Sequence, residues 1–243
     1  MTSPKIIISL CDESLEWSRR FAERDGGQVY AVDPKHAERM DMKPGPLAME
    51  ATVCGAGIVT RMGMTVDDFI RWHLPKLVAS GTIVGVIAQP VCTEFSGAGA
   101  RHWKRKDTER PELLEGAKRL VSDCLHVVAV AQPAWWIMEN PVGRMGRVCG
   151  LGKPVMSYQP HEYAHMAEGD AADEQYTKRT CLWGTFNADA LGDMKGDLPP
   201  LVWGANGNTS RMHACYGGAS AATKEARSKT PTGFAEAFWH AHD

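Results

Sequence analysis

The chain has 243 residues, of which 44% are hydrophobic and 23% charged, and its formal net charge is −2. This size suits one domain with a small appendage or two small domains, and the charge argues against a protein that coats nucleic acid through bulk positive charge. No apolar run approaches the length that crosses a membrane, and the first residues lack the pattern of a secretory signal. We therefore expect a cytosolic protein.

The chain opens with a strand, a helix and a second strand. Residues 4–11 form a short apolar run with β-branched residues, which predicts a buried strand. Residues 13–27 have helical spacing and end on a glycine pair, and residues 28–34 read as a strand that ends at Asp33. A strand, a helix and a strand ending in an acid are typical of the start of a nucleotide-binding α/β unit.

The middle of the chain alternates in the same way. Residues 40–64 show no clear period and are predicted to be a loop, and residues 65–80 predict a helix bent at a proline. Residues 82–88 predict a strand that delivers Cys92 just past its end. Residues 110–131 predict the longest amphipathic helix, and residues 134–140 a strand ending near Glu139.

After this point the predicted strands shorten, to residues 153–158 and 180–186, and one helix is predicted over residues 232–242. The alternation predicts an α/β fold, a mostly parallel Rossmann-like sheet with helices on both faces and a small C-terminal extension. Ligands bind outside the carboxyl ends of strands in such sheets, so we expect Asp12, Asp33, Cys92 and Glu139 to gather at one edge.

Seven cysteines occur at positions 11, 54, 92, 124, 149, 181 and 215, with no pair at zinc-finger spacing. An odd, scattered set favours neither a zinc site nor a disulfide framework. Most are expected to be buried small hydrophobes, Cys124 among them. A cysteine after a strand is more often structural than catalytic, but the tight turn and glycines after Cys92 favour a nucleophile.

Glu139 follows an apolar run with two tryptophans. An apolar environment favours the protonated form of a carboxyl group, which can hydrogen-bond a ring nitrogen. The alternative is that Glu139 only caps the turn before Pro141.

Two of these segments together resemble a known family. The segment PVCTEFS at residues 90–96 resembles the Pro-Cys motif of the DNA cytosine-5 methyltransferases, and ENP at residues 139–141 resembles their Glu-Asn motif. The resemblance is greatest to the small cytosine-5 methyltransferase-like proteins often carried by bacteriophages, and it spans nearly the whole chain apart from residues 42–64. It implies a class I fold that uses S-adenosylmethionine, with a catalytic domain over residues 1–186 and a reduced target-recognition segment with a terminal helix over residues 187–243.

The resemblance implies that Cys92 adds to C6 of a flipped-out cytosine while Glu139 engages N3, so that C5 accepts the methyl group of S-adenosylmethionine. Aligned on Gly184, the segment QYTKRTCLWG places Arg179 where the family contacts the cytosine O2, although a change of register would put Lys178 there. The implied cofactor-binding residues are Asp12, Ser14, Trp17, Asp33, Asp41 and Pro90. The implied DNA contacts are Ser96, Arg101, Lys104 and Arg105, in a glycine-hinged basic segment that closes over double-stranded DNA.

The first loop departs from the family pattern. The family has Phe-x-Gly-x-Gly after its first strand, whereas residues 10–14 here are LCDES and contain no glycine. Close approach of the backbone to the cofactor is therefore not assured. Because of this departure, we retain the alternative hypothesis of an enzyme with the same fold and the same Cys92 and Glu139 chemistry that acts on tRNA cytosine or a free cytosine nucleotide. A non-catalytic DNA-binding relative is a third reading, which the intact Cys92 and Glu139 disfavour. We expect a monomer in each case.

The segment HEYAH at residues 161–165 fits the zinc metallopeptidase signature. That chemistry needs both imidazoles on one helical face. The flanking residues read instead as a turn and an acidic loop, so we expect His161 and His165 to be surface or loop residues.

Overall fold

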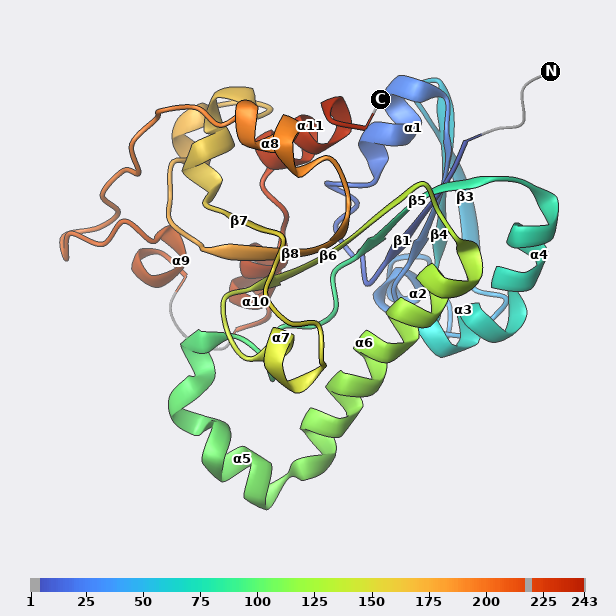
Figure 1. Ribbon diagram of the computed structural model, residues 1–243, viewed down its shortest axis with the longest axis horizontal. Coiled ribbons are helices and arrows are strands. Elements are labelled where there is room, and N and C mark those ends of the chain that lie inside the picture. The colour runs from blue at the N-terminus through green and yellow to red at the C-terminus, as the bar shows by residue number, and fades with distance from the viewer. Residues whose placement is uncertain (1–4, 217–219, 243) are drawn as a thin grey trace. The chain divides into compact units, whose positions relative to one another are not determined.

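The computed structural model describes residues 5–216 and 220–242, coloured along the chain in Figure 1. Contacts divide these residues into two compact units. Of the described residues, the first unit comprises residues 5–155 and 181–186, and the second comprises residues 156–180, 187–216 and 220–242. The residues expected to form a separate C-terminal region, 187–243, thus group with residues 156–180.

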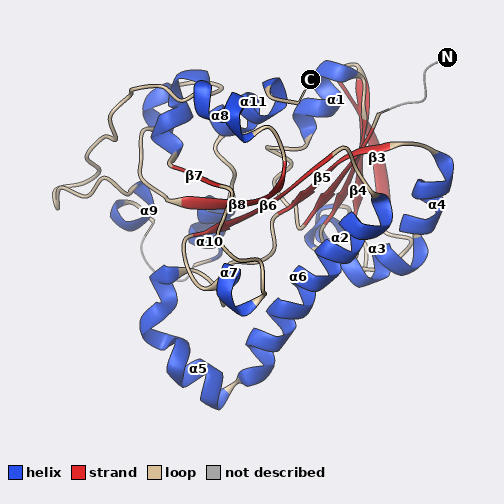
Figure 2. Cartoon of the chain, in the orientation of Figure 1, coloured by secondary structure: helices blue, strands red, loops and turns tan. Residues whose placement is uncertain are grey.

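The fold is α/β, with an eight-stranded, mostly parallel sheet flanked by helices (Figure 2). The strand order is β3-β4-β2-β1-β5-β6-β8-β7. Four neighbouring pairs, β4–β2, β2–β1, β1–β5 and β5–β6, run parallel, and β3 runs antiparallel to β4. The strands are β1 (Ile6–Leu10), β2 (Gln28–Val32), β3 (Met49–Cys54), β4 (Gly57–Met62), β5 (Ile83–Ala88), β6 (Trp135–Pro141), β7 (Met156–Tyr158) and β8 (Thr180–Thr185).

The helices of the first unit follow the predicted alternation. They are α1 (Arg19–Asp25), α2 (Lys35–Arg39), α3 (Val66–Trp72), α4 (Leu74–Ser80), α5 (Trp103–Glu109), α6 (Pro111–Ala131) and α7 (Met145–Val148). The predicted bend near Pro75 is a break at His73 between α3 and α4. Proline cannot supply the amide hydrogen that a continuous helix would need at this point.

Both faces of the central strands are buried, which explains their continuous apolar sequence. On one face Ile8 packs in a cluster with Phe69 of α3 and Val121 of α6. Side chains alternate along a strand, so the neighbour Ile7 points to the other face, where Phe21 of α1 lies 5.3 Å from Trp135 between ring centroids. Helices therefore cover both faces of this sheet, as the sequence predicts.

Two segments differ from their prediction. Residues 40–64 were expected to be a loop, but they contain the β3–β4 hairpin, which extends the sheet at one edge. All but the last residue of β3 are exposed, so no burial alternation marks this strand in the sequence. The glycine-hinged basic segment is also ordered into helix: a 3-10 turn, η1 (Gly97–His102), leads directly into α5.

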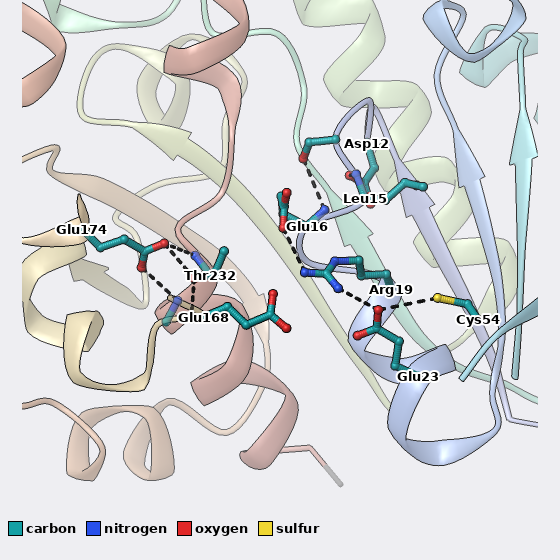
Figure 3. Close-up of polar contacts among 11 residues, drawn as sticks. Asp12, Leu15, Glu16, Arg19, Glu23, Cys54, Glu168, Glu174 and Thr232 are labelled. Atoms are coloured by element: carbon teal, nitrogen blue, oxygen red, sulfur yellow. Dashed lines mark hydrogen bonds and ion pairs between the residues drawn. The ribbon is translucent and has the colours of Figure 1, made fainter. Parts of the chain in front are cut away.

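The second unit is built from short elements around a compact aromatic centre. Its helices are η2 (Pro160–Met166), η3 (Ala171–Glu174), α8 (Ala188–Asp193), α9 (Arg211–Ala214), α10 (Ala221–Ser228) and α11 (Thr232–His240). Tyr158 stacks on Phe234 with ring centroids 3.9 Å apart, and Tyr163 meets both rings edge-on. The carboxylate of Glu174 accepts hydrogen bonds from the main-chain N–H groups of Thr232 and Gly233 at the start of α11 (Figure 3).

Among the described residues of the chain, no helix is long and apolar enough to span a membrane.

Candidate active site

The parallel strands of the first unit end at one common edge. The register pairs Leu10 with both Val32 and Ala88, and it pairs Ala88 with Met138. The pattern of hydrogen bonds between neighbouring strands continues one residue further. Cys11 donates its N–H to the Val32 carbonyl, and Gln89 donates its N–H to the Leu10 carbonyl. Asp12, Asp33 and Pro90 follow their strands, and Glu139 lies near the carboxyl end of β6 just beyond its paired residue Met138, so all four lie at the same edge of the sheet.

Cys92 lies in a tight turn two residues beyond Pro90. Its carbonyl accepts hydrogen bonds from the N–H groups of Phe95 at 3.0 Å and Ser96 at 2.8 Å. The ring of Phe95 is fully buried, whereas Cys92 is exposed. The buried ring thus anchors a turn that presents the thiol to solvent.

Asn140 connects this turn to the neighbouring strand. Its side chain is fully buried, and Nδ2 donates to the Pro90 carbonyl at 2.8 Å. Glu139 is the preceding residue of β6 and is half-buried. Because successive side chains of a strand point to opposite faces, Asn140 can bind the backbone before Cys92 while Glu139 points away from that contact.

The loop after β1 is built around Asp12. Its Oδ2 accepts the hydroxyls of Ser9 at 2.8 Å and Ser18 at 2.5 Å, and its Oδ1 accepts the N–H of Leu15 at 2.9 Å. Burial raises the pKa of this carboxyl group. Asp12 is only 1% exposed, so it shapes the loop rather than offering a free carboxylate to a ligand.

Figure 3 places Asp12 beside Leu15, and Glu16, Arg19 and Glu23 continue along the chain into α1. Arg19 pairs with Glu16 at 3.3 Å and with Glu23 at 2.7 Å. These contacts order the segment that leads out of the loop into the helix.

Left-handed backbone occurs in this loop without glycine. Cys11 has φ 58° and Leu15 has φ 62°, a conformation that costs a non-glycine residue about 1–2 kcal/mol. This loop thus adopts left-handed backbone at residues that carry side chains. A hydrogen bond with Cys124 and burial raise the pKa of the Cys11 thiol, and Cys124 is fully buried, as predicted.

The other expected cofactor residues differ in exposure. Asp33 is half-buried, and burial raises its pKa to about 6 although its Oδ1 accepts the Lys35 N–H at 2.9 Å. Ser14 is half-buried and Asp41 is exposed. Trp17 is fully buried and leaves no surface for a ligand in this conformation. Asp33 is therefore the expected cofactor residue whose position and chemistry fit best.

The basic segment after Cys92 presents its charges outward. Arg101, Lys104 and Arg105 are exposed, and Ser96 is half-buried and accepts the N–H of Ala98. Arg105 lies 3.9 Å from Glu109 one turn along α5. Three cations on one exposed segment suit contact with phosphates.

Arg179 belongs to the second unit and is exposed just before β8. Its neighbour Lys178 donates to the Arg227 carbonyl at 2.8 Å, and Gln175 donates to the Pro199 carbonyl at 2.9 Å. These contacts use the polar ends of Lys178 and Gln175 inside the unit, which favours Arg179 of the two basic candidates. Its contact with a base stays a prediction.

The HEYAH segment forms the 3-10 helix η2. Glu162 accepts the Gln159 N–H at 2.7 Å and pairs with Lys195 at 3.1 Å, while His161 contacts the Leu198 carbonyl through Nδ1 at 2.9 Å. With three residues per turn, positions four apart do not share a face as they do in an α-helix. Within the part of the chain that the structure describes, no group of three metal-ligating side chains is placed to hold an ion.

Two site features were not predicted: the Asn140 contact and a buried arginine, Arg144, that follows the Glu-Asn motif. An arginine in a Gly-containing turn normally indicates a solvated surface. Its burial depends on Trp103 and Asp107, which are distant in sequence, and only proximity to the motif could have drawn attention to it.

In comparisons with known proteins, no family model matches the chain, and no curated protein matches it. Among solved structures, the chain is similar to an E. coli protein described as a proposed DNA modification methyltransferase encoded within a prophage, with 16% sequence identity and a TM-score of 0.42. The match covers 74% of this chain and 46% of the other, so the chain spans less than half the length of that protein.

Proposed function

We propose that the protein transfers a methyl group from S-adenosylmethionine to C5 of cytosine in DNA, with Cys92 as the nucleophile. The observation that carries the proposal is the juxtaposition of two adjacent parallel strands. Cys92 follows β5, Glu139 lies near the carboxyl end of β6, and Asn140 of β6 donates a hydrogen bond to the Pro90 carbonyl that precedes Cys92. The carboxyl edge of a parallel sheet is where ligands bind, and the resemblance of both segments to the Pro-Cys and Glu-Asn motifs supplies the chemistry.

In the proposed reaction the Cys92 thiolate adds to C6 of a cytosine that has left the base stack. Glu139 hydrogen-bonds N3 as the ring gains electron density, so C5 becomes nucleophilic. C5 takes the methyl group and S-adenosylhomocysteine is released. A water molecule then takes the C5 proton, the electrons of the C5–H bond restore the double bond, and the C6–sulfur bond breaks to release Cys92 as a thiolate. The exposed position of the thiol suits attack on a base brought in from solvent.

The methyl donor would supply an electrophilic carbon at this edge. Asp33 fits the ribose hydroxyls, because it follows the second strand and keeps one oxygen beyond its contact with the Lys35 N–H. Asp12 and the left-handed residues Cys11 and Leu15 would fix the shape of the loop beside it. Asp12 then acts on the cofactor through the loop, in place of the direct contact that the resemblance implies.

The DNA backbone would contact the exposed basic segment that begins at Ser96. Arg101, Lys104 and Arg105 carry the charges that could pair with phosphates, and such contacts position the duplex without reading its sequence. A second candidate substrate is a tRNA cytosine or a free cytosine nucleotide. The observation that favours this second substrate class is the glycine-free loop after β1, with its two left-handed residues.

The test is methyl transfer from tritiated S-adenosylmethionine to duplex DNA, tRNA and dCMP in separate reactions. Cys92→Ala is compared with Cys215→Ala, because Cys92 and Cys215 are the two exposed cysteines of the described chain. Label in DNA with wild type and Cys215→Ala, and its loss with Cys92→Ala, is the expected result. Label confined to tRNA or dCMP would select the second substrate class, and transfer that survives in Cys92→Ala would contradict the mechanism.

A further inference from the structure

Arg144 is a buried cation in the turn that follows β6. The residue is 5% exposed, and its N–H donates to the Phe95 carbonyl at 2.9 Å. Its Nε donates to the Glu94 carbonyl at 2.8 Å. The main chain and the side chain of one residue thus bind two consecutive carbonyls in the segment just after Cys92.

The other end of the guanidinium group binds α5. Its two terminal nitrogens donate to the two carboxylate oxygens of Asp107, at 2.6 and 2.9 Å. The guanidinium carbon lies 4.7 Å from the centroid of the Trp103 ring. A bidentate pair with a planar carboxylate and stacking on an aromatic ring both require arginine, because lysine has neither the planar fork nor the second donor in fixed geometry.

Further contacts support this arrangement. Within the segment from Cys92 to α5, Lys106 donates to the buried carboxylate of Glu94 at 2.6 Å, and the next two contacts join that segment to the turn after β6. Gly97 donates its N–H to the Val142 carbonyl at 2.8 Å. A Cβ on Gly143 would lie 1.9 Å from the Phe95 carbonyl oxygen, so the two chain segments approach too closely there for any other residue.

We infer that Arg144 is a positioning residue that latches the segment from Cys92 to α5 against the end of β6. Glu139 is fixed in β6, so the latch sets where the thiol stands relative to that carboxyl group. It also sets where the basic residues of α5 stand relative to the thiol. This inference rests on the proposed function for its catalytic meaning, whereas the latch itself is a property of the fold.

The experiment compares Asp107→Asn and Arg144→Lys with two matched controls. Asp67→Asn removes a charge from an exposed Asp–Arg pair on α3, and Arg147→Lys changes an exposed arginine on α7. Asp107→Asn keeps the buried arginine and its contacts with Glu94, so it tests the latch without emptying the site. Arg144→Lys keeps the charge but loses the fork.

Two readouts are measured on the intact protein: backbone hydrogen exchange over residues 93–109, and kcat and KM for methyl transfer. Asp107→Asn is expected to speed exchange in this segment about tenfold, because the amide keeps one acceptor oxygen but loses the charge and the second acceptor of the bidentate pair. It should lower kcat about tenfold and leave KM for S-adenosylmethionine unchanged. Arg144→Lys should change both readouts at least as much as Asp107→Asn, because lysine loses the fork, the Nε contact with the Glu94 carbonyl and the stacking on Trp103.

Exchange and kcat equal to those of the two controls would overturn the inference, and so would a rise in KM for S-adenosylmethionine with kcat unchanged. If wild type transfers no methyl group to any substrate, the proposed function fails. Faster exchange in Asp107→Asn would then still support the latch, and unchanged exchange would reject it.

Discussion

The side-chain amide of Asn140 donates a hydrogen bond to the main-chain carbonyl of Pro90, at 2.8 Å and in a fully buried setting. The two residues are 50 positions apart in the chain, yet each is adjacent to a candidate catalytic segment. Pro90 leads into the turn of Cys92, and Asn140 follows Glu139 directly. One buried hydrogen bond therefore links the expected nucleophile to the expected acid.

Replacing Asn140 with alanine should destabilise the protein by about 1–3 kcal/mol, because it leaves the Pro90 carbonyl buried without this donor. Urea denaturation followed by circular dichroism measures the change. Val142→Ala, at an exposed position just after β6, should stay within about 0.5 kcal/mol of wild type. Equal stability of Asn140→Ala and Val142→Ala would show that the contact contributes little.

Asp33 predicts a pH dependence with a defined sign. Its pKa in the folded protein is about 6, raised by burial from 3.8. The folded state therefore binds the proton more tightly than the unfolded state, so stability is greatest below pH 4 for this group and declines as the pH rises to 6. For this half-buried group we expect the free energy of unfolding to fall by about 1–3 kcal/mol over this pH range.

Asp33→Asn should remove this decline, and denaturation at several pH values between 4 and 7 measures it. Affinity for S-adenosylmethionine should change in the opposite direction. An ionised carboxylate accepts hydrogen bonds from ribose hydroxyls better than a protonated one, so wild-type affinity should rise through pH 6. An affinity that is flat across this range would argue against Asp33 as the ribose ligand.

Gly85 predicts a contrast between two glycine-to-alanine substitutions. A Cβ at Gly85 in β5 would lie 2.1 Å from Cζ2 of Trp135, whereas a Cβ at Gly116 in α6 would meet nothing within 4 Å. Gly85→Ala should cost about 1–3 kcal/mol through overpacking. Gly116→Ala should stabilise the protein by about 0.5–1 kcal/mol, since alanine favours the helix interior. Thermal denaturation of the two variants measures both changes in stability. A Gly85→Ala variant as stable as wild type would show that Trp135 can move aside.

The sequence predicts the central strands and α6 well because their burial leaves a direct pattern. Continuous apolar residues mark β1 and β5, and spaced apolar residues mark α6. The β3 strand lacks such a pattern. It is an exposed strand at the edge of the sheet, so its sequence need not alternate between apolar and polar residues. The segment from Gly97 to His102 reads as a flexible hinge, since glycine content does not reveal that Gly97 binds the Val142 carbonyl.

The candidate site is predicted only in part for the same reason. Strand ends can be located in the sequence, so Asp33, Cys92 and Glu139 are found at one edge. The burial of Asp12 and Trp17 depends on how the loop folds back on α1. The environment of Arg144 depends on α5, whose helix was not predicted. Contacts between segments far apart in sequence leave no local pattern to read.

The most direct test of the central claim is covalent capture of the protein on duplex DNA that contains 5-fluorocytosine, in the presence of S-adenosylmethionine. Fluorine at C5 cannot leave as a proton does, so the adduct formed by attack at C6 should persist through denaturing electrophoresis. Wild type and Cys215→Ala should form the complex, and Cys92→Ala should not. A complex with Cys92→Ala, or none with wild type while a known cytosine-5 methyltransferase is captured on the same DNA, would contradict the account.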